Sequence, residues 1–147
     1  MAESRELSSR ECLTLLRAGV AGRIALATPT GPQIVPVNYS VVDDAIIVRT
    51  SPYSLLGTHG RDTTFAFEID GFDPTNERGW SVQARGRSEA VTDRDDLAAI
   101  RAVAEPQPWA GNGGRALYLR LRWTELTGRK LGSDWDPVSH LPASRSA

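Results

Sequence analysis

The stretch from Gln33 to Thr50 constrains the fold of this 147-residue chain more than any other. Ile, Val and Tyr dominate its two arms, and these residue types favour β-strands. Asp43 and Asp44 interrupt the apolar run with residues that are typical of turns. Two apolar runs around a short acidic turn predict a β-hairpin.

The same stretch carries polar residues where a ligand could meet a strand. Asn38 and Tyr39 lie inside the first arm, and Arg49 and Thr50 end the second arm, where the chain leaves the sheet. An apolar wall with a few placed polar groups is the usual make-up of a small-molecule site. The hairpin is therefore a candidate binding element as well as a structural one.

Two short helices are expected. Ser8 precedes Glu11 by three residues, the spacing of a capping box, so a helix should begin there and end near Gly19. Thr92 or Asp93 should cap a second helix that runs to about Ala104. The expected apolar faces are Leu13, Leu16 and Val20, with Cys12 and Leu15 beside them, in the first helix, and Leu97, Ile100, Val103 and Ala104 in the second.

The remaining apolar runs read as strands. They span residues 22–28, 63–70, 79–92, 116–123 and 125–130, while 51–60 holds at most one helical turn and 105–114 is loop by composition. Phe65, Phe67 and Ile69 alternate with polar or small residues, which predicts one buried face. Pro36 indicates a bulge or an edge, and Gly86 permits a bend. About six short strands, mostly antiparallel, favour a small closed or partly closed barrel.

Composition describes an ordinary globular domain. The chain is 40% hydrophobic and 24% charged with a net charge of -1, so no overall basic excess points to nucleic acid. Arg120, Arg122 and Arg129 form a basic late segment that could contact RNA, but a solvated face or substrate rim is the favoured interpretation. No run of residues is long and apolar enough for a membrane span or signal peptide, so we expect a cytoplasmic protein.

Few residues suggest metal binding or nucleophilic catalysis. Cys12 is the single cysteine, which excludes an intramolecular disulfide and leaves too few thiolates for a zinc or iron–sulfur site. His59 and His140 are too isolated for a metal pair. No Ser-His-Asp, Cys-His, paired-carboxylate or phosphate-loop motif is recognisable, so the catalytic residues stay unassigned and no metal is expected.

A set of short motifs, taken in order, resembles the FMN-binding split-barrel family related to pyridoxamine 5′-phosphate oxidase. The resemblance implies a mainly β fold, a six-stranded antiparallel split barrel with Greek-key connections over residues 1–133, followed by a flexible C-terminal tail at 134–147. It also implies a homodimer with FMN in two clefts between the subunits; some relatives use the deazaflavin F420 or bind haem instead. The motifs are Gly22-Arg23-Ile24-Ala25, Pro36-Val37-Asn38-Tyr39, Arg49-Thr50, Phe67-Glu68-Ile69-Asp70, Gly79-Trp80-Ser81-Val82, Arg85-Gly86-Arg87 and Leu126-Thr127-Gly128-Arg129.

The resemblance assigns a cofactor role to nine residues. The strand Pro36, Val37, Asn38 and Tyr39 would lie along the isoalloxazine ring; Arg49, Thr50 and Ser54 would meet the ribityl-phosphate end; Trp80 and Ser81 would approach the flavin from a neighbouring segment or subunit. These assignments suit a phosphate, which needs cationic and hydroxyl donors, and a flat ring, which needs an apolar wall. Structural alternatives remain open for Asn38 as a buried hydrogen-bonding amide, for Thr50 and Ser54 as local caps, and for Trp80 as a dimer contact.

One position departs from the family pattern. Leu55 stands where relatives commonly carry a lysine. Losing that cation would weaken FMN binding by about 1.5–3 kcal/mol if the contact is charge-assisted and poorly solvated, and Arg61 is a candidate to replace it.

The favoured function is therefore hydride or electron transfer between FMN and a small-molecule substrate. The alternatives are a flavin- or haem-binding carrier or sensor without turnover and an F420-dependent reductase.

Overall fold

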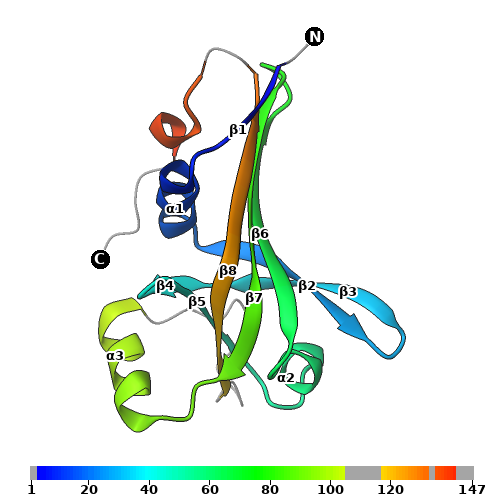
Figure 1. Cartoon of the computed structure of the whole chain (residues 1–147), viewed down its shortest axis with the longest axis vertical. Coiled ribbons are helices and arrows are strands. Elements are labelled where there is room, and N and C mark those ends of the chain that lie inside the picture. Colours follow the sequence, from blue (N-terminus) through cyan, green and yellow to red (C-terminus); the bar gives the residue numbers. More distant parts are fainter. Residues whose placement is uncertain (1–2, 105–116, 133–134, 142–147) are drawn as a thin grey trace.

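The computed structural model of the chain describes residues 3–104, 117–132 and 135–141. Within these ranges the chain forms a strongly curled sheet with three α-helices and one short 3-10 helix packed around it (Figure 1). In chain order the elements are β1 (Ser4–Glu6), α1 (Ser9–Ala18), β2 (Ala21–Thr28), β3 (Gly31–Asn38), β4 (Ser40–Val42), β5 (Ala45–Thr50), α2 (Leu55–His59), β6 (Thr64–Asp73), β7 (Arg78–Ala90), α3 (Arg94–Ala104), β8 (Leu117–Leu131) and η1 (Pro137–His140).

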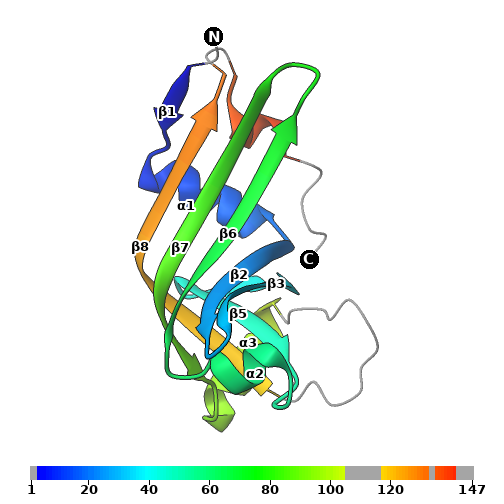
Figure 2. The ribbon, with the colours of Figure 1, turned by 90° about the vertical axis from the view of Figure 1, so that its right-hand side faces the viewer.

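The described strands form one antiparallel sheet in the order β3-β2-β6-β7-β8-β5-β4, with β1 paired to β8. The ends of this order, β3 and β4, are neighbours in the chain and are separated by Tyr39 alone. The sheet must curl for one residue to join its two ends, which gives the half-barrel of Figure 2. The predicted mainly β split barrel is confirmed, although the described residues form eight strands instead of six.

The predicted hairpin forms only in its second part. Asp43 and Asp44 adopt positive φ angles of 48° and 57° and make a two-residue loop between β4 and β5, as the primed hairpin turns require. The first arm was expected to continue this pairing, but residues 31–38 pair with β2 along their whole length. The chain therefore changes partners at Tyr39, so that β3 becomes an edge strand, which suits Pro36.

The last two predicted strands are one long strand. β8 pairs with β7 from Gly79 to Ala90, and the register shifts between Arg85 and Gly86. A Cβ at Gly86 would lie 2.2 Å from the carbonyl oxygen of Arg122, so the strands approach too closely there for any side chain. The irregularity expected at Gly86 is confirmed, and it bends β8 without ending it.

Helix α1 begins and ends where the sequence predicts. The Ser8 side chain accepts a hydrogen bond from the Glu11 amide, and the Glu11 carboxylate accepts one from the Ser8 amide. The buried face consists of Cys12, Leu15 and Leu16. The expectation that Val20 continues this face was wrong, because the chain turns after Gly19 and leaves the Val20 side chain 52% exposed.

The core has two parts, one on each side of the curled sheet. The larger part fills the half-barrel beneath α1 and includes Leu16, Ile24 and Phe67; the predicted buried face of β6 is part of it. The smaller part lies under α3, where Ile100 packs on Tyr118 and Ile47. Val103, which was also expected on the buried face of α3, is 70% exposed.

Part of the segment predicted to be a flexible tail is structured. Pro137 to His140 form η1, which lies against α1, and Val138 and Leu141 pack on the larger core. The Asp136 side chain caps this turn by accepting from the Val138 amide. The predicted loop at 105–114 and the first residue of the predicted strand at 116 lie outside the described residues. Among the described helices, none is long and apolar enough to cross a membrane.

We predict that Ser8→Ala lowers the free energy of unfolding by about 1 kcal/mol, because it removes the cap of α1. Ser9→Ala is the matched control, since Ser9 is exposed in the first turn and takes no part in the capping box. Urea unfolding of both variants checks the prediction. Equal midpoints for Ser8→Ala and Ser9→Ala would show that the cap contributes nothing.

Candidate functional site

The outward side of β3 is an open surface. Pro36 is exposed and pairs with Arg23 of β2, while Val37 faces the other way and packs on the core. Asn38, two residues beyond Pro36, lies on the outward side by strand alternation and is partly buried. Of the four strand residues assigned to the ring, Pro36 and Asn38 are thus placed where a flat ligand could lie against the sheet.

Tyr39 has a structural position. Its side chain is 1% exposed, its hydroxyl donates to the Leu16 carbonyl, and its ring meets Phe67 edge-on at 4.7 Å between centroids. A Cβ at Gly19 would lie 2.2 Å from the Tyr39 hydroxyl oxygen, so the glycine makes room for it. Tyr39 therefore holds α1 against the corner between β3 and β4 and faces the core.

Two neighbouring carboxylates share one arginine beside Pro36. Arg23 lies 2.8 Å from the Glu68 carboxylate and also pairs with Asp70. Burial and the adjacent Asp70 raise the pKa of Glu68, with Arg23 acting in the opposite direction. Both carboxylates are more than 40 residues from Arg23 in sequence, so only the register of β2 on β6 brings the three together. The sequence gives no signal for this cluster beyond the alternation in β6.

Thr50 and Ser54 are in contact, and Ser54 is a local cap, the structural alternative left open for it. Their hydroxyl oxygens are 2.7 Å apart, and the Ser54 hydroxyl also donates to the Ser51 carbonyl at 2.8 Å. The Gly57 amide donates to the same Ser54 oxygen, which makes Ser54 the cap of α2. Because the single Ser54 proton is directed at Ser51, Thr50 donates to Ser54. The Ser54 oxygen then accepts from both Thr50 and the Gly57 amide, so its hydrogen bonds are all made within the chain, and Thr50 can offer a ligand only an acceptor.

Arg49 lies on the opposite side of the sheet from Thr50. Its guanidinium carbon is 5.4 Å from the centre of the Tyr118 ring, and that of Arg101 from α3 is 5.5 Å from the same centre. Consecutive strand residues point to opposite faces, so the predicted Arg49–Thr50 pair is divided between α3 and α2. Tyr118 is buried beneath the two cations.

Arg61 lies over the turn that contains Leu55. Its Nε donates to the Gly57 carbonyl at 2.8 Å, and a terminal nitrogen is 3.5 Å from the Pro52 carbonyl. Leu55 itself is 41% exposed at the first position of α2. Arg61 therefore supplies a cation at this turn, where relatives commonly carry a lysine. The family resemblance assigns a phosphate contact to the same turn.

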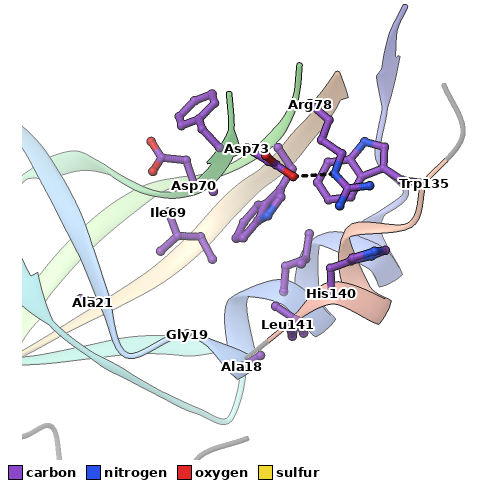
Figure 3. Close-up of a pocket in the computed structure, with 14 residues that line it drawn as sticks. Ala18, Gly19, Ala21, Ile69, Asp70, Asp73, Arg78, Trp135, His140 and Leu141 are labelled. Atoms are coloured by element: carbon purple, nitrogen blue, oxygen red, sulfur yellow. Dashed lines mark hydrogen bonds and ion pairs between the residues drawn. The ribbon is translucent and has the colours of Figure 1, made fainter. Parts of the chain in front are cut away.

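Trp80 and Ser81 are also on opposite faces. Ser81 lies between Asp70 and Arg129 on the outward side, whereas the Trp80 indole covers Gly71 on the other. Trp80 lines a cavity of about 450 Å³ between the end of α1, the upper part of β6 and β7, and η1 (Figure 3). Arg78, Trp135 and His140 also line this cavity, and sequence reasoning assigned neither Trp135 nor His140 to a site.

The basic late segment is neutralised by carboxylates. Arg120 lies 2.9 Å from Glu89 and 3.2 Å from Asp96, and Arg122 lies 3.4 Å from Glu89. The Glu89 pKa is lowered chiefly by its hydrogen bond to Arg120. Arg129 is 3.9 Å from Glu6. These pairs tie β7 and β8 to their neighbours and leave little net positive charge on the segment.

Within one chain, then, the nine assigned residues do not line one pocket. Thr50 and Ser54 are in contact, and Pro36, Asn38 and Ser81 share the outward face, while the others face the core, the cavity or α3. In the part of the chain that the structure describes, no three His, Cys, Asp or Glu side chains are grouped to hold a metal ion.

One family model and one curated relative match this chain. The family described as pyridoxamine 5′-phosphate oxidase matches residues 8–130. An uncharacterized protein of Mycobacterium tuberculosis is 31% identical over 106 residues, which cover 69% of this chain and 70% of that protein.

Solved structures show the same fold as this chain. The FAD binding protein of Mycobacterium smegmatis is similar with a TM-score of 0.73 and 32% identity, over 85% of this chain and 96% of that one. A FAD-binding protein of Mesorhizobium loti shares the fold with a TM-score of 0.68 and 20% identity, over 90% of this chain and all of that one.

We predict that Glu68→Gln stabilises the protein at neutral pH. Because folding raises the pKa of Glu68, ionising this carboxyl costs more free energy in the folded chain than in the unfolded chain. The free energy of unfolding therefore falls as the pH rises through the folded-state pKa of Glu68. The gain should disappear below about pH 4, where Glu68 is protonated in both states. Thermal unfolding against pH checks this, with Glu125→Gln, which removes a carboxylate paired to Arg85, as control. A variant less stable than the natural chain at neutral pH would contradict the prediction.

Proposed function

Because the chain belongs to the pyridoxamine 5′-phosphate oxidase family, we propose that it is a flavin-binding oxidoreductase that transfers hydride or electrons to or from a small molecule. The observation that carries the proposal is the exposed outward side of β3, with Pro36 and Asn38 on it, in a chain that matches the family over residues 8–130. The flavin, when bound, supplies the redox chemistry, and the protein supplies position and electrostatics.

The ring and the phosphate would be held by different elements. The ring would lie along the outward side of β3, against the exposed Pro36, while the Asn38 side-chain oxygen is buried within the chain. The phosphate would be held at the turn before α2, where Arg61 contacts the Gly57 and Pro52 carbonyls. The Arg49 side chain lies on the Tyr118 side of the sheet. To contact the same phosphate it would have to extend past the end of β5 to the other side. The phosphate role therefore depends on Arg61, because the Thr50 and Ser54 protons are used within the chain.

We further propose a homodimer formed through the outward face. Ile34 is 70% exposed, and its neighbours across the strands are Ala25 and then Ala66, so a flat apolar row crosses β3, β2 and β6. Burying this row against a second copy removes apolar surface from water. The same contact would bring the partner's outward face, with its own copy of Ser81, toward the ring.

A second candidate function is a flavin carrier or sensor without turnover. Leu55 in place of the lysine favours this second function, because weaker binding of the phosphate suits a protein that takes up and releases its cofactor. The two functions differ in one observable property: an oxidoreductase loses its flavin colour anaerobically with NADH or NADPH, and a carrier does not.

We predict that the purified protein binds added flavin and that Arg61→Ala weakens this binding by about 1.5–3 kcal/mol, roughly 10- to 150-fold in Kd, because it removes a charge-assisted phosphate contact. Arg17→Ala is the matched control, since Arg17 forms an exposed ion pair with Asp44 outside the proposed site. Flavin fluorescence titration measures both variants.

The titration uses FMN and FAD, because the family resemblance points to FMN and the similar Mycobacterium smegmatis protein binds FAD. A preference for one flavin assigns the cofactor. If neither flavin binds the natural chain, the proposed function is wrong.

Arg49→Ala should also weaken flavin binding, by about 1.5–3 kcal/mol if the residue contacts the phosphate. Its control is Arg49→Lys, which keeps the charge and should lose less. An Arg49→Ala titration indistinguishable from that of the natural chain would confine the phosphate site to the α2 turn.

We predict that Ile34→Asp converts a dimer into a monomer, because it places a charge in the apolar row. Val103→Asp is the control, since Val103 is equally exposed at 70% but lies on α3. Light scattering coupled to size exclusion gives the masses. A natural chain that elutes as a monomer, or an unchanged mass for Ile34→Asp, would rule out this interface.

A further inference from the structure

The 450 Å³ cavity is separate from the proposed flavin surface. It lies on the α1 side of the sheet, whereas the flavin surface is the outward side of β3. Figure 3 shows Ala18 and Gly19 at one wall and Trp135, His140 and Leu141 at another, facing β6. Its volume falls within the range of about 300–1,000 Å³ that is usual for small-molecule sites.

Two indoles in the cavity wall are fixed in place. Trp80 covers Gly71, where even a Cβ would lie 2.6 Å from the indole nitrogen. Trp135 donates from its indole nitrogen to the Leu131 carbonyl at 2.9 Å, and the Arg78 guanidinium lies 4.8 Å from the centre of its ring. Fixed aromatic faces favour a flat ring, because stacking needs no reordering of the wall.

The cavity also contains an open strand edge. β2 pairs with β6 only from Ala66 to Glu68, so the edge of β6 beyond Glu68 has no partner on that side among the described strands. The Ser88 amide donates to the Thr63 carbonyl, which makes residues 63 and 88 a hydrogen-bonded pair.

That pair fixes which backbone groups face the cavity. Hydrogen-bonded pairs alternate along an antiparallel ladder, so odd-numbered β6 residues bond β7 and even-numbered ones point away from it. Asp70 and Phe72 therefore direct their amide N–H and carbonyl groups to the open edge, and both residues line the cavity. The edge offers adjacent donors and acceptors to whatever occupies the space.

The charged groups around the cavity are already balanced. Hydrogen bonds from Asn76 are the main cause of the lowered pKa of Asp73, and Arg78 at 3.2 Å adds to it. Asp70 pairs with Arg23. His140 Nδ1 donates to the Asp136 carbonyl at 2.9 Å. A charged ligand would have to compete with these pairs, so the cavity favours an uncharged one.

We propose that this cavity binds an uncharged heteroaromatic amide, a single ring bearing a carboxamide or lactam. The ring lies against Trp80, and the amide pairs its N–H and C=O with the backbone of Asp70 or Phe72, as an added strand would. The inference is independent of flavin binding. Trp80 is the one residue that it shares with the assigned cofactor residues, and its flavin role comes from the family resemblance alone.

The test uses nicotinamide as the probe and pyridine, which lacks the amide, as the comparison. Nicotinamide added to the full, isotope-labelled chain should shift the backbone amide signals of Asp70 and Phe72 and bind at least about tenfold more tightly than pyridine, a difference of roughly 1.4 kcal/mol. Equal affinities, or shifts confined to other parts of the chain, would overturn the proposal.

A pair of variants tests the location without removing a packed tryptophan. Ala18→Phe adds a ring at the cavity wall and should abolish nicotinamide binding, whereas Ala99→Phe adds the same ring on the exposed side of α3 and should leave it unchanged. Unchanged binding by a folded Ala18→Phe chain would contradict the proposed location. Adding saturating FMN to the natural chain should not displace nicotinamide; displacement would mean that the two ligands share one site.

Discussion

The contact between Tyr39 and the end of α1 determines how the rest of the molecule is built. One residue joins the two ends of the sheet, and its hydroxyl is tied to the Leu16 carbonyl while Gly19 leaves room for it. A buried hydroxyl without this partner would cost about 1–3 kcal/mol, so the corner and the helix are fixed together. From this corner β3 runs as the edge strand on one side and β4 starts the hairpin on the other.

The closure leaves the molecule with two different faces. The inside of the curl is filled by the core and by α1, and the outside of β3, β2 and β6 presents a flat surface with small apolar residues beside the Arg23 cluster. A flat surface cannot enclose a ligand by itself. The proposed second copy could complete a site only on this outward face, since Tyr39 faces the core and Arg49 lies on the Tyr118 side.

The sequence predicted most of the fold because its local signals are strong. The capping box at Ser8, the alternation of Phe65, Phe67 and Ile69, and Gly86 as a point of irregularity are all found in the structure. The pairing of β3 with β2 was missed, because apolar runs do not say which neighbour a strand takes. Val20 and Val103 were misplaced, since both lie near helix ends where the helical period no longer decides burial.

The candidate site was harder to predict, because it depends on register and side-chain direction. The division of Arg49 from Thr50 and of Trp80 from Ser81 follows from strand alternation, but only after the strand bounds are known. The Arg23, Glu68 and Asp70 cluster and the Trp80–Trp135 cavity join segments far apart in the chain. No local motif encodes these.

Hydrogen–deuterium exchange with and without flavin tests most directly whether the outward face of β3 is the cofactor surface. The account predicts slower amide exchange on flavin binding in peptides that cover residues 33–38 and 52–61, with the Trp80–Trp135 cavity little affected. Protection confined to the cavity, or to α3, would contradict it.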